Sequence, residues 1–205
     1  MEPNELESSI IEKYTDRNLS VAQIAHDFNI TISKVRYCLN KFEIPKRSIS
    51  EAITNLNITK FGKIPFNLKK NLSVEEEELR VAGTMLYWAE GAKIGSNNIK
   101  FVNSDPDMIK LFLRFLRDIC GIHEERLKPL LHLYHDQDRH KLEKFWSGVA
   151  KIPLTRFNKS HIHQGKIGTY RKKSPYGTIA LNYSDKKLLG KILSWIEEYK
   201  YRHLP

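Results

Sequence analysis

Residues 20–42 read SVAQIAHDFNITISKVRYCLNKF and carry the clearest structural signal in the chain. Ser20 and Thr31 are hydroxyl residues of the kind that cap helix N-termini, so a helix is expected after each of them. Asn29 falls in the short turn between the two helices, where left-handed backbone is needed and asparagine adopts it at modest cost. The apolar residues expected in the core that the two helices share are Ile24, Ala25, Phe28, Ile30, Val35 and Leu39. The stretch therefore predicts two crossing helices joined by a tight turn.

The second of these helices presents a polar face away from that core. Its outward residues are Thr31, Ser33, Lys34, Arg36 and Tyr37. In DNA-binding proteins the N-terminal part of such a helix enters the major groove. Arg36 has the two-pronged side chain that reads guanine, whereas Lys34 is better suited to phosphate. These five residues are therefore candidate contacts to double-stranded DNA.

An amphipathic helix is expected before this pair, because Leu6, Ile10 and Tyr14 recur at helical spacing. Together with the ending IPKRSISEA, residues 8–51 resemble the resolvase-type helix-turn-helix of many bacterial and phage DNA-binding proteins. The resemblance implies a DNA-binding domain over residues 1–47. The alternative is a three-helix packing module that does not bind nucleic acid.

The positive charge of the chain is concentrated outside this domain. The whole chain has a net charge of +10, but residues 1–50 have equal numbers of basic and acidic residues. Residues 151–175 contain seven basic residues and no acidic ones, which is the electrostatic footprint of a polyanion binder. The alternative for this segment is a solvated basic loop. The candidate DNA contacts here are Lys159, Lys166, Tyr170, Arg171, Lys172 and Lys173.

Residues 48–72 have scattered Asn, Gly and Pro with weak periodicity, so we expect a linker that holds at most a short helix near residues 50–56. The second domain is then expected over residues 73–205. Ser73 and Glu76 form a capping box, and the helix they begin should end at Gly91, a natural residue to follow a helix.

A unit of strand, acidic turn and amphipathic helix then recurs three times. The copies are IKFVNSDPDMIKLFLRFLRDI, LLHLYHDQDRHKLEKFWSGVA and TIALNYSDKKLLGKILSWIEEY. Asp105, Asp136 and Asp185 stand in the three turns, where an aspartate can cap the following helix. The pattern predicts an α+β domain, in which helices cover one face of a mainly antiparallel sheet.

Residues 83–91 read GTMLYWAEG and resemble the motif of the LAGLIDADG homing endonucleases. Ala89, Glu90 and Gly91 fall on the closing Ala-Asp-Gly of that motif, and the strand and helix text that follows is similar to the family over residues 73–200. The chain departs from the family at the motif's second and third positions. Small residues stand there in the family, and Thr84 and Met85 stand there in this chain.

The resemblance implies a homodimer, in which paired motif helices from two chains bring their terminal acids together. Glu90 would then help to hold Mg²⁺ if the protein cleaves DNA, because Mg²⁺ prefers carboxylate oxygens. Lys93 and Lys100 are the candidates for the lysine that family enzymes use near the attacking water. The alternative for Glu90 is an ordinary exposed residue at a helix end.

Histidines also cluster along the chain, at His132, His135 and His140, with His161 and His163 further on. No spacing among them matches a known zinc pattern, so the sequence favours no metal site there. His161 and His163 should share one face of a strand and could contact DNA phosphate together with Lys159.

Three functions are compatible with these observations. The first is a site-specific, Mg²⁺-dependent DNA endonuclease acting as a homodimer. The second is a transcriptional regulator whose endonuclease-like domain does not cleave, like the WhiA-type regulators, which join the two domain types in the opposite order. The third is an RNA-binding or protein-interaction module. Cys38 and Cys120 read as buried free thiols, and no apolar run approaches membrane-spanning length, so we expect a cytoplasmic protein without a membrane partner.

Overall fold

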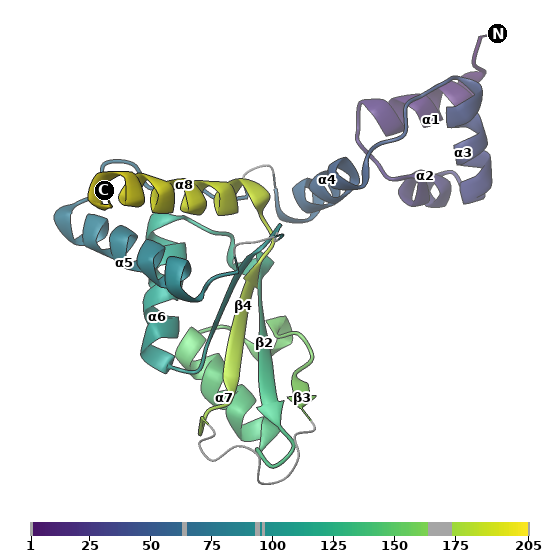
Figure 1. Cartoon of the computed structure of the whole chain (residues 1–205). Helices are drawn as coiled ribbons and strands as arrows, with labels where there is room; N and C mark the ends of the chain where they lie inside the picture. The colour runs from purple at the N-terminus through teal and green to yellow at the C-terminus, as the bar shows by residue number, and fades with distance from the viewer. Residues whose placement is uncertain (1, 63–64, 93–94, 96, 164–173, 205) are drawn as a thin grey trace. The chain divides into compact units, whose positions relative to one another are not determined.

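The computed structural model describes residues 2–62, 65–92, 95, 97–163 and 174–204. The chain forms two compact units, residues 1–63 and 64–205. Eight α-helices and a four-stranded sheet account for most of the described residues (Figure 1), which confirms the predicted α+β class. No helix among the described residues is long and apolar enough to cross a membrane.

The first unit is entirely helical. Its helices are α1 (Glu5–Thr15), α2 (Val21–Asp27), α3 (Ile32–Lys41) and α4 (Ile49–Phe61). Ser20 and Thr31 cap α2 and α3 as predicted, each accepting a hydrogen bond from the backbone N–H three residues ahead. Asn29 has a φ of 49°, which is the left-handed turn expected there. Ile24, Ala25, Val35 and Leu39 are buried, and Phe28 and Ile30 pack against them, so the predicted core of the helix pair is confirmed.

Residues 48–72, expected as a linker, contain regular structure. Ser48 and Glu51 form a capping box that begins α4, a helix longer than the sequence suggested. Beyond the boundary between the units, Asn67 donates a backbone hydrogen bond to the carbonyl of Gly121, and Phe66 pairs with Ile122. Residues 65–72 therefore belong to the packed part of the second unit.

The second unit combines helices with one sheet. The helices are α5 (Val74–Glu90), α6 (Pro106–Arg114), α7 (Arg139–Ala150) and α8 (Lys186–His203), and a π-helical turn (Phe115–Ile119) extends α6. The strands are β1 (Ile99–Asn103), β2 (Leu127–Tyr134), β3 (His161–His163) and β4 (Thr178–Tyr183), in the order β1-β4-β2-β3.

The sheet is mainly antiparallel, as predicted, and one of its three strand pairs is parallel. β1 and β2 run antiparallel to β4, but β3 runs parallel to β2. The chain between β2 and β3 passes through α7, and a crossover of this length lets two strands pair in parallel.

One of the three predicted aspartate caps is wrong, and the predicted end of α5 at Gly91 is confirmed. Asp105 and Asp185 cap α6 and α8 as predicted, but the cap of α7 is Asp138 and not Asp136. Gly91 follows α5 in an extended conformation, with φ −80° and ψ 148°, and it bridges to Phe101 of β1. A side chain at this position would meet the ring and the carbonyl of Tyr87 at 2.5 Å, so close packing rather than a left-handed turn requires glycine.

The sheet buries one face in the core and keeps the other partly exposed. Along β2, fully buried residues alternate with half-buried ones at the period of a strand. On the buried face Phe101 stacks on Phe112 of α6, with ring centroids 4.1 Å apart, and Trp146 of α7 is fully buried in the same core. Cys38 and Cys120 are free and buried as expected, and burial raises the pKa of both thiols.

Candidate nucleic-acid interface

The outward face of α3 presents all of its predicted contact residues to solvent. Thr31, Ser33, Lys34, Arg36 and Tyr37 are each exposed, and 69% of the Tyr37 side chain is accessible. Val35, Cys38 and Leu39 hold the opposite face of the helix in the core. A rigid helix with donors, a phenol ring and two cations along one exposed side can contact base edges and phosphates.

Arg47 fixes the segment that leads from α3 into α4. Its guanidinium lies 4.0 Å from the centre of the Tyr14 ring and donates to the carbonyl oxygens of Tyr14, Asn18 and Leu19. Its backbone N–H donates to the Tyr14 hydroxyl at 3.1 Å. Arg47 is therefore a structural residue, and its charge is directed into the unit rather than toward a ligand.

A groove of about 410 Å³ lies between α4 and the other helices of the first unit. Arg36 and Lys46 line its polar part, whereas Leu39 and Leu56 contribute to its larger apolar part. Arg36 is thus shared between this groove and the exposed face of α3. The groove makes the surface beside α3 concave. Among the described residues, no cluster of acidic side chains there suggests a catalytic site.

The partly exposed face of the sheet carries rows of polar and basic side chains. The strand register places Lys100 of β1 beside Asn182 of β4, and Asn182 beside Lys128 of β2. A second row joins Thr178, His132 and His161. Because residues at alternate positions of a strand share one face, these side chains lie on the same side of the sheet. This face combines cations, an amide and imidazoles, which are all groups that bind phosphate.

Short strand β3 is held in one orientation by its neighbours. Ser160 is buried and its hydroxyl donates to Oε1 of Glu143 on α7 at 2.7 Å. The backbone N–H of Asn158 donates to the carbonyl of Pro129 on β2 at 2.8 Å. Lys159, His161 and His163, which alternate with Ser160, are exposed. His161 and His163 therefore share one face of β3, as predicted.

The parallel pairing of β3 with β2 brings three histidines together. Nδ1 of His132 lies 3.1 Å from Nε2 of His163, and the ring centroids of His132 and His161 are 5.7 Å apart. Burial lowers the pKa of His132, and the charges of His163, Lys100 and His161 lower it further. The His132 imidazole is consequently neutral at neutral pH.

Glu90 lies at the C-terminal end of α5 and is exposed. The next residue, Gly91, bridges to β1, and the backbone N–H of Ala92 donates to the carbonyl of Lys100 at 3.0 Å. This brings Glu90 near the strand that carries Lys100. A single carboxylate does not make a Mg²⁺ site, and no group of three His, Cys, Asp or Glu side chains in the described parts of the chain can hold a metal as it stands.

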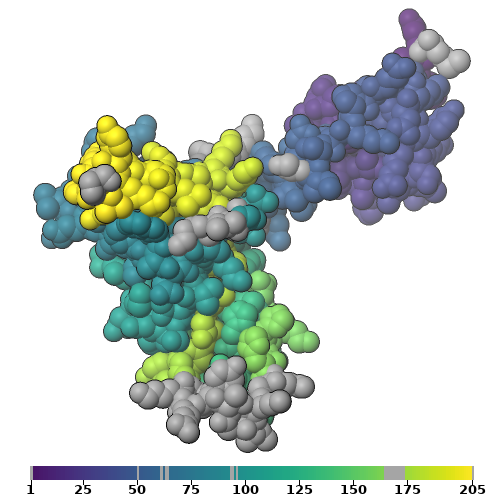
Figure 2. All heavy atoms as spheres, viewed as in Figure 1, coloured from purple at the N-terminus to yellow at the C-terminus, as the bar shows by residue number. Residues whose placement is uncertain are grey.

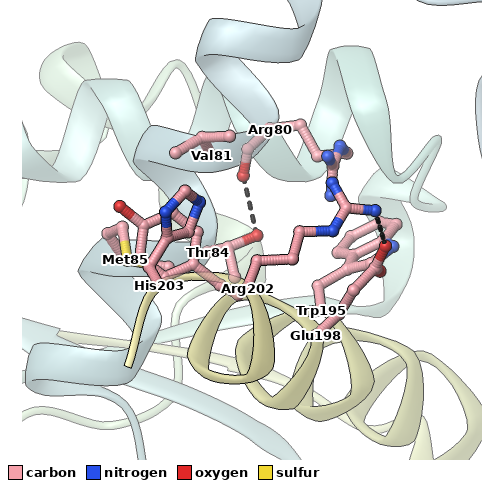
Figure 3. Close-up of a pocket in the computed structure, with 9 residues that line it drawn as sticks. Arg80, Val81, Thr84, Met85, Trp195, Glu198, Arg202 and His203 are labelled. Atoms are coloured by element: carbon pink, nitrogen blue, oxygen red, sulfur yellow. Dashed lines mark hydrogen bonds and ion pairs between the residues drawn. The ribbon is translucent and has the colours of Figure 1, made fainter. Parts of the chain in front are cut away.

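Both long faces of α5 contact other elements of the same chain. Gly83 is buried against Phe115, so its small size serves packing within the chain. In the space-filling view α8 lies over α5 (Figure 2). Figure 3 shows the small cavity of about 100 Å³ between them, where the hydroxyl of Thr84 donates to the carbonyl of Arg80 at 2.7 Å. The cavity is much smaller than a ligand pocket.

Several predicted site residues, one a catalytic candidate and the others DNA contacts, lie outside the described residues. These are Lys93, Lys166, Tyr170, Arg171, Lys172 and Lys173. Conversely, sequence reasoning did not select Lys128, Asn182 or His132 as interface residues, because their common face depends on the strand order. The alternation of apolar and polar residues along 127–134 predicts a strand with one exposed face. It does not show which strands lie beside β2 in the sheet.

Comparison with known proteins adds no relative to this description. No protein-family model, no curated protein and no solved structure matches the chain.

Proposed function

We propose that this protein binds double-stranded DNA sequence-specifically, with a helix-turn-helix formed by α2 and α3 as the base-reading element. The observation that carries the proposal is the exposed polar face of α3, which holds Thr31, Ser33, Lys34, Arg36 and Tyr37 on a helix that is packed on its other side. A tight turn with left-handed Asn29 precedes it, as the motif requires.

The partly exposed face of the sheet provides the second contact surface. Lys100, Lys128 and the nearby Lys159 supply positive charge there, which the first unit alone does not offer. In this proposal α3 selects bases and the sheet face adds phosphate contacts. Regulation by binding, without cleavage, is the form of the function that we favour, because it needs only the α3 face and the sheet face of a single chain.

The test begins with selection of binding sites from a random duplex library, followed by fluorescence anisotropy on the selected site. We expect Arg36→Ala to reduce the affinity for the selected site by about 1–3 kcal/mol, or about 5- to 150-fold, while binding to unrelated duplexes changes little. Lys34→Ala should weaken binding to all duplexes, and it should reduce the slope of log affinity against log salt concentration by about one.

Arg17→Ala is the matched control, because Arg17 is an exposed arginine of the first unit that pairs with Glu12 outside α3. Its affinity for the selected duplex should equal that of the unmodified protein. A chain that selects no sequence, or whose Arg36→Ala variant binds the selected duplex unchanged, would contradict the proposal.

Cleavage is the second candidate, and the position of the exposed Glu90 beside the Lys100 strand favours it. It requires a homodimer, because a second chain would have to supply the other acid. Incubation of a plasmid carrying the selected site with Mg²⁺ tests it, using Glu90→Gln against the unmodified protein. Linearisation that disappears in the variant would establish a nuclease, whereas intact plasmid in both reactions would leave DNA binding alone.

A further inference from the structure

The three histidines on the partly exposed sheet face have the arrangement of a metal-binding set. His161 and His163 are separated by one residue on β3, so they share one face of the strand. His132 is directly opposite His161 on β2. Two histidines at alternate positions of one strand and a third on its neighbour can approach a single ion from three directions.

The distances between the rings are close to those that one ion would impose. In a tetrahedral zinc site with bonds of about 2.0–2.1 Å, two ligating nitrogens lie about 3.3 Å apart and their ring centroids lie about 5 Å apart. His132 and His163 have nitrogens 3.1 Å apart and ring centroids 5.3 Å apart. The centroid of His161 is 5.7 Å from that of His132 and 6.2 Å from that of His163.

We infer that His132, His161 and His163 form a site for a divalent transition-metal ion of the zinc type, bound through three imidazoles. The three rings do not converge on one point as they stand. His161 and His163 are exposed, and exposed side chains change rotamer readily, so the inferred site forms by rotation of these two side chains toward His132.

The chemistry of the side chains selects the class of ion. Neutral imidazole suits Zn²⁺, Ni²⁺ and Cu²⁺, whereas Mg²⁺ and Ca²⁺ require oxygen ligands. The positive charge of Lys100 acts on His132 and opposes a bound metal ion, so we expect moderate rather than very tight affinity.

Three protein ligands leave one tetrahedral position open for water or another oxygen ligand, as in catalytic zinc sites. This position would lie on the sheet face that carries Lys100 and Lys128. The inference does not rest on DNA binding, because the metal titration needs no nucleic acid.

The experiment is a calorimetric titration of the full-length, untagged and metal-stripped protein with Zn²⁺, repeated with Co²⁺ to record the visible absorption of a tetrahedral site. We expect one ion per chain, and at least a tenfold weaker affinity in His161→Ala and in His163→Ala. Affinity should also fall as the buffer is taken to about pH 5.5, where imidazoles bind protons instead.

His140→Ala is the matched control, because His140 is an exposed histidine on α7 outside the three-histidine set. It should bind Zn²⁺ like the unmodified protein. His161 and His163 are exposed, so their replacement should leave the fold intact, which circular dichroism of each variant verifies. Absence of Zn²⁺ binding would overturn the inference. Binding that survives in the double variant His161→Ala/His163→Ala would also overturn it, because the ion would then be held elsewhere.

Discussion

Gly83 illustrates how a single residue of α5 supports the second unit. A Cβ atom placed on Gly83 would lie 2.1 Å from Cγ of Phe115, well inside any tolerated contact. The π-helical turn that carries Phe115 therefore packs directly on the backbone of α5. The small size of Gly83 therefore serves packing within one chain.

We predict that Gly83→Ala destabilises the second unit by about 1–3 kcal/mol, because overpacking at Phe115 outweighs the better helix propensity of alanine. Gly190→Ala is the control of opposite sign. Gly190 lies inside α8 with nothing within 4 Å of its added Cβ, so alanine there should stabilise by about 0.5–1 kcal/mol. Urea unfolding followed by tryptophan fluorescence measures both, since Trp88, Trp146 and Trp195 all lie in the second unit. Equal stability of Gly83→Ala and the unmodified protein would contradict the described packing.

For the helices, the sequence correctly predicted the features that depend only on residues close together in the chain. The caps Ser20, Thr31 and Ser73 and the turn at Asn29 are local features, and the structure has each of them. The sequence predicts Asp136 as the cap of α7, but the path of the backbone places Asp138, an identical side chain two residues further on, at the start of the helix.

The arrangement of the strands could not be predicted in the same way. Pairing between β2 and β3 joins residues about 30 positions apart, and their parallel direction follows from the crossover through α7. The exposed face of α3 was therefore predictable residue by residue. Once the core-facing residues of a helix are identified, its period fixes which residues lie on the opposite side. The rows formed by Lys100, Asn182 and Lys128 and by the three histidines were not predictable, because each draws on separate strands.

The whole molecule divides its charge unequally between its units. Residues 1–63 have nine basic and eight acidic residues, whereas residues 64–205 have 25 basic and 16 acidic residues, which gives net charges of +1 and +9. In the proposed function, the part of the affinity for DNA that comes from neutralised phosphates must therefore come mostly from the second unit. The first unit is suited to reading bases but has little charge with which to hold the duplex.

We predict that a chain ending at residue 63 binds the selected duplex at least tenfold more weakly than the full chain. Its affinity should also depend less steeply on salt, because fewer counterions are released. The truncated chain keeps α1–α4 and the core around Ile24 and Val35, so its helical circular dichroism serves as the control for folding. The same salt slope in both proteins would show that the second unit contributes no phosphate contacts.

The short passage between the units has a thermodynamic consequence. Helix α4 ends at Phe61, and the carbonyl of Pro65 already accepts a hydrogen bond from the Tyr183 hydroxyl in the second unit. If both units contact one duplex, as we propose, binding of one unit confines the other to a small volume, at an effective concentration that short linkers bring to the millimolar range. Two individually weak contacts would then give strong binding to a duplex that carries a binding site for each unit. A duplex that carries only one of the two sites would be bound weakly.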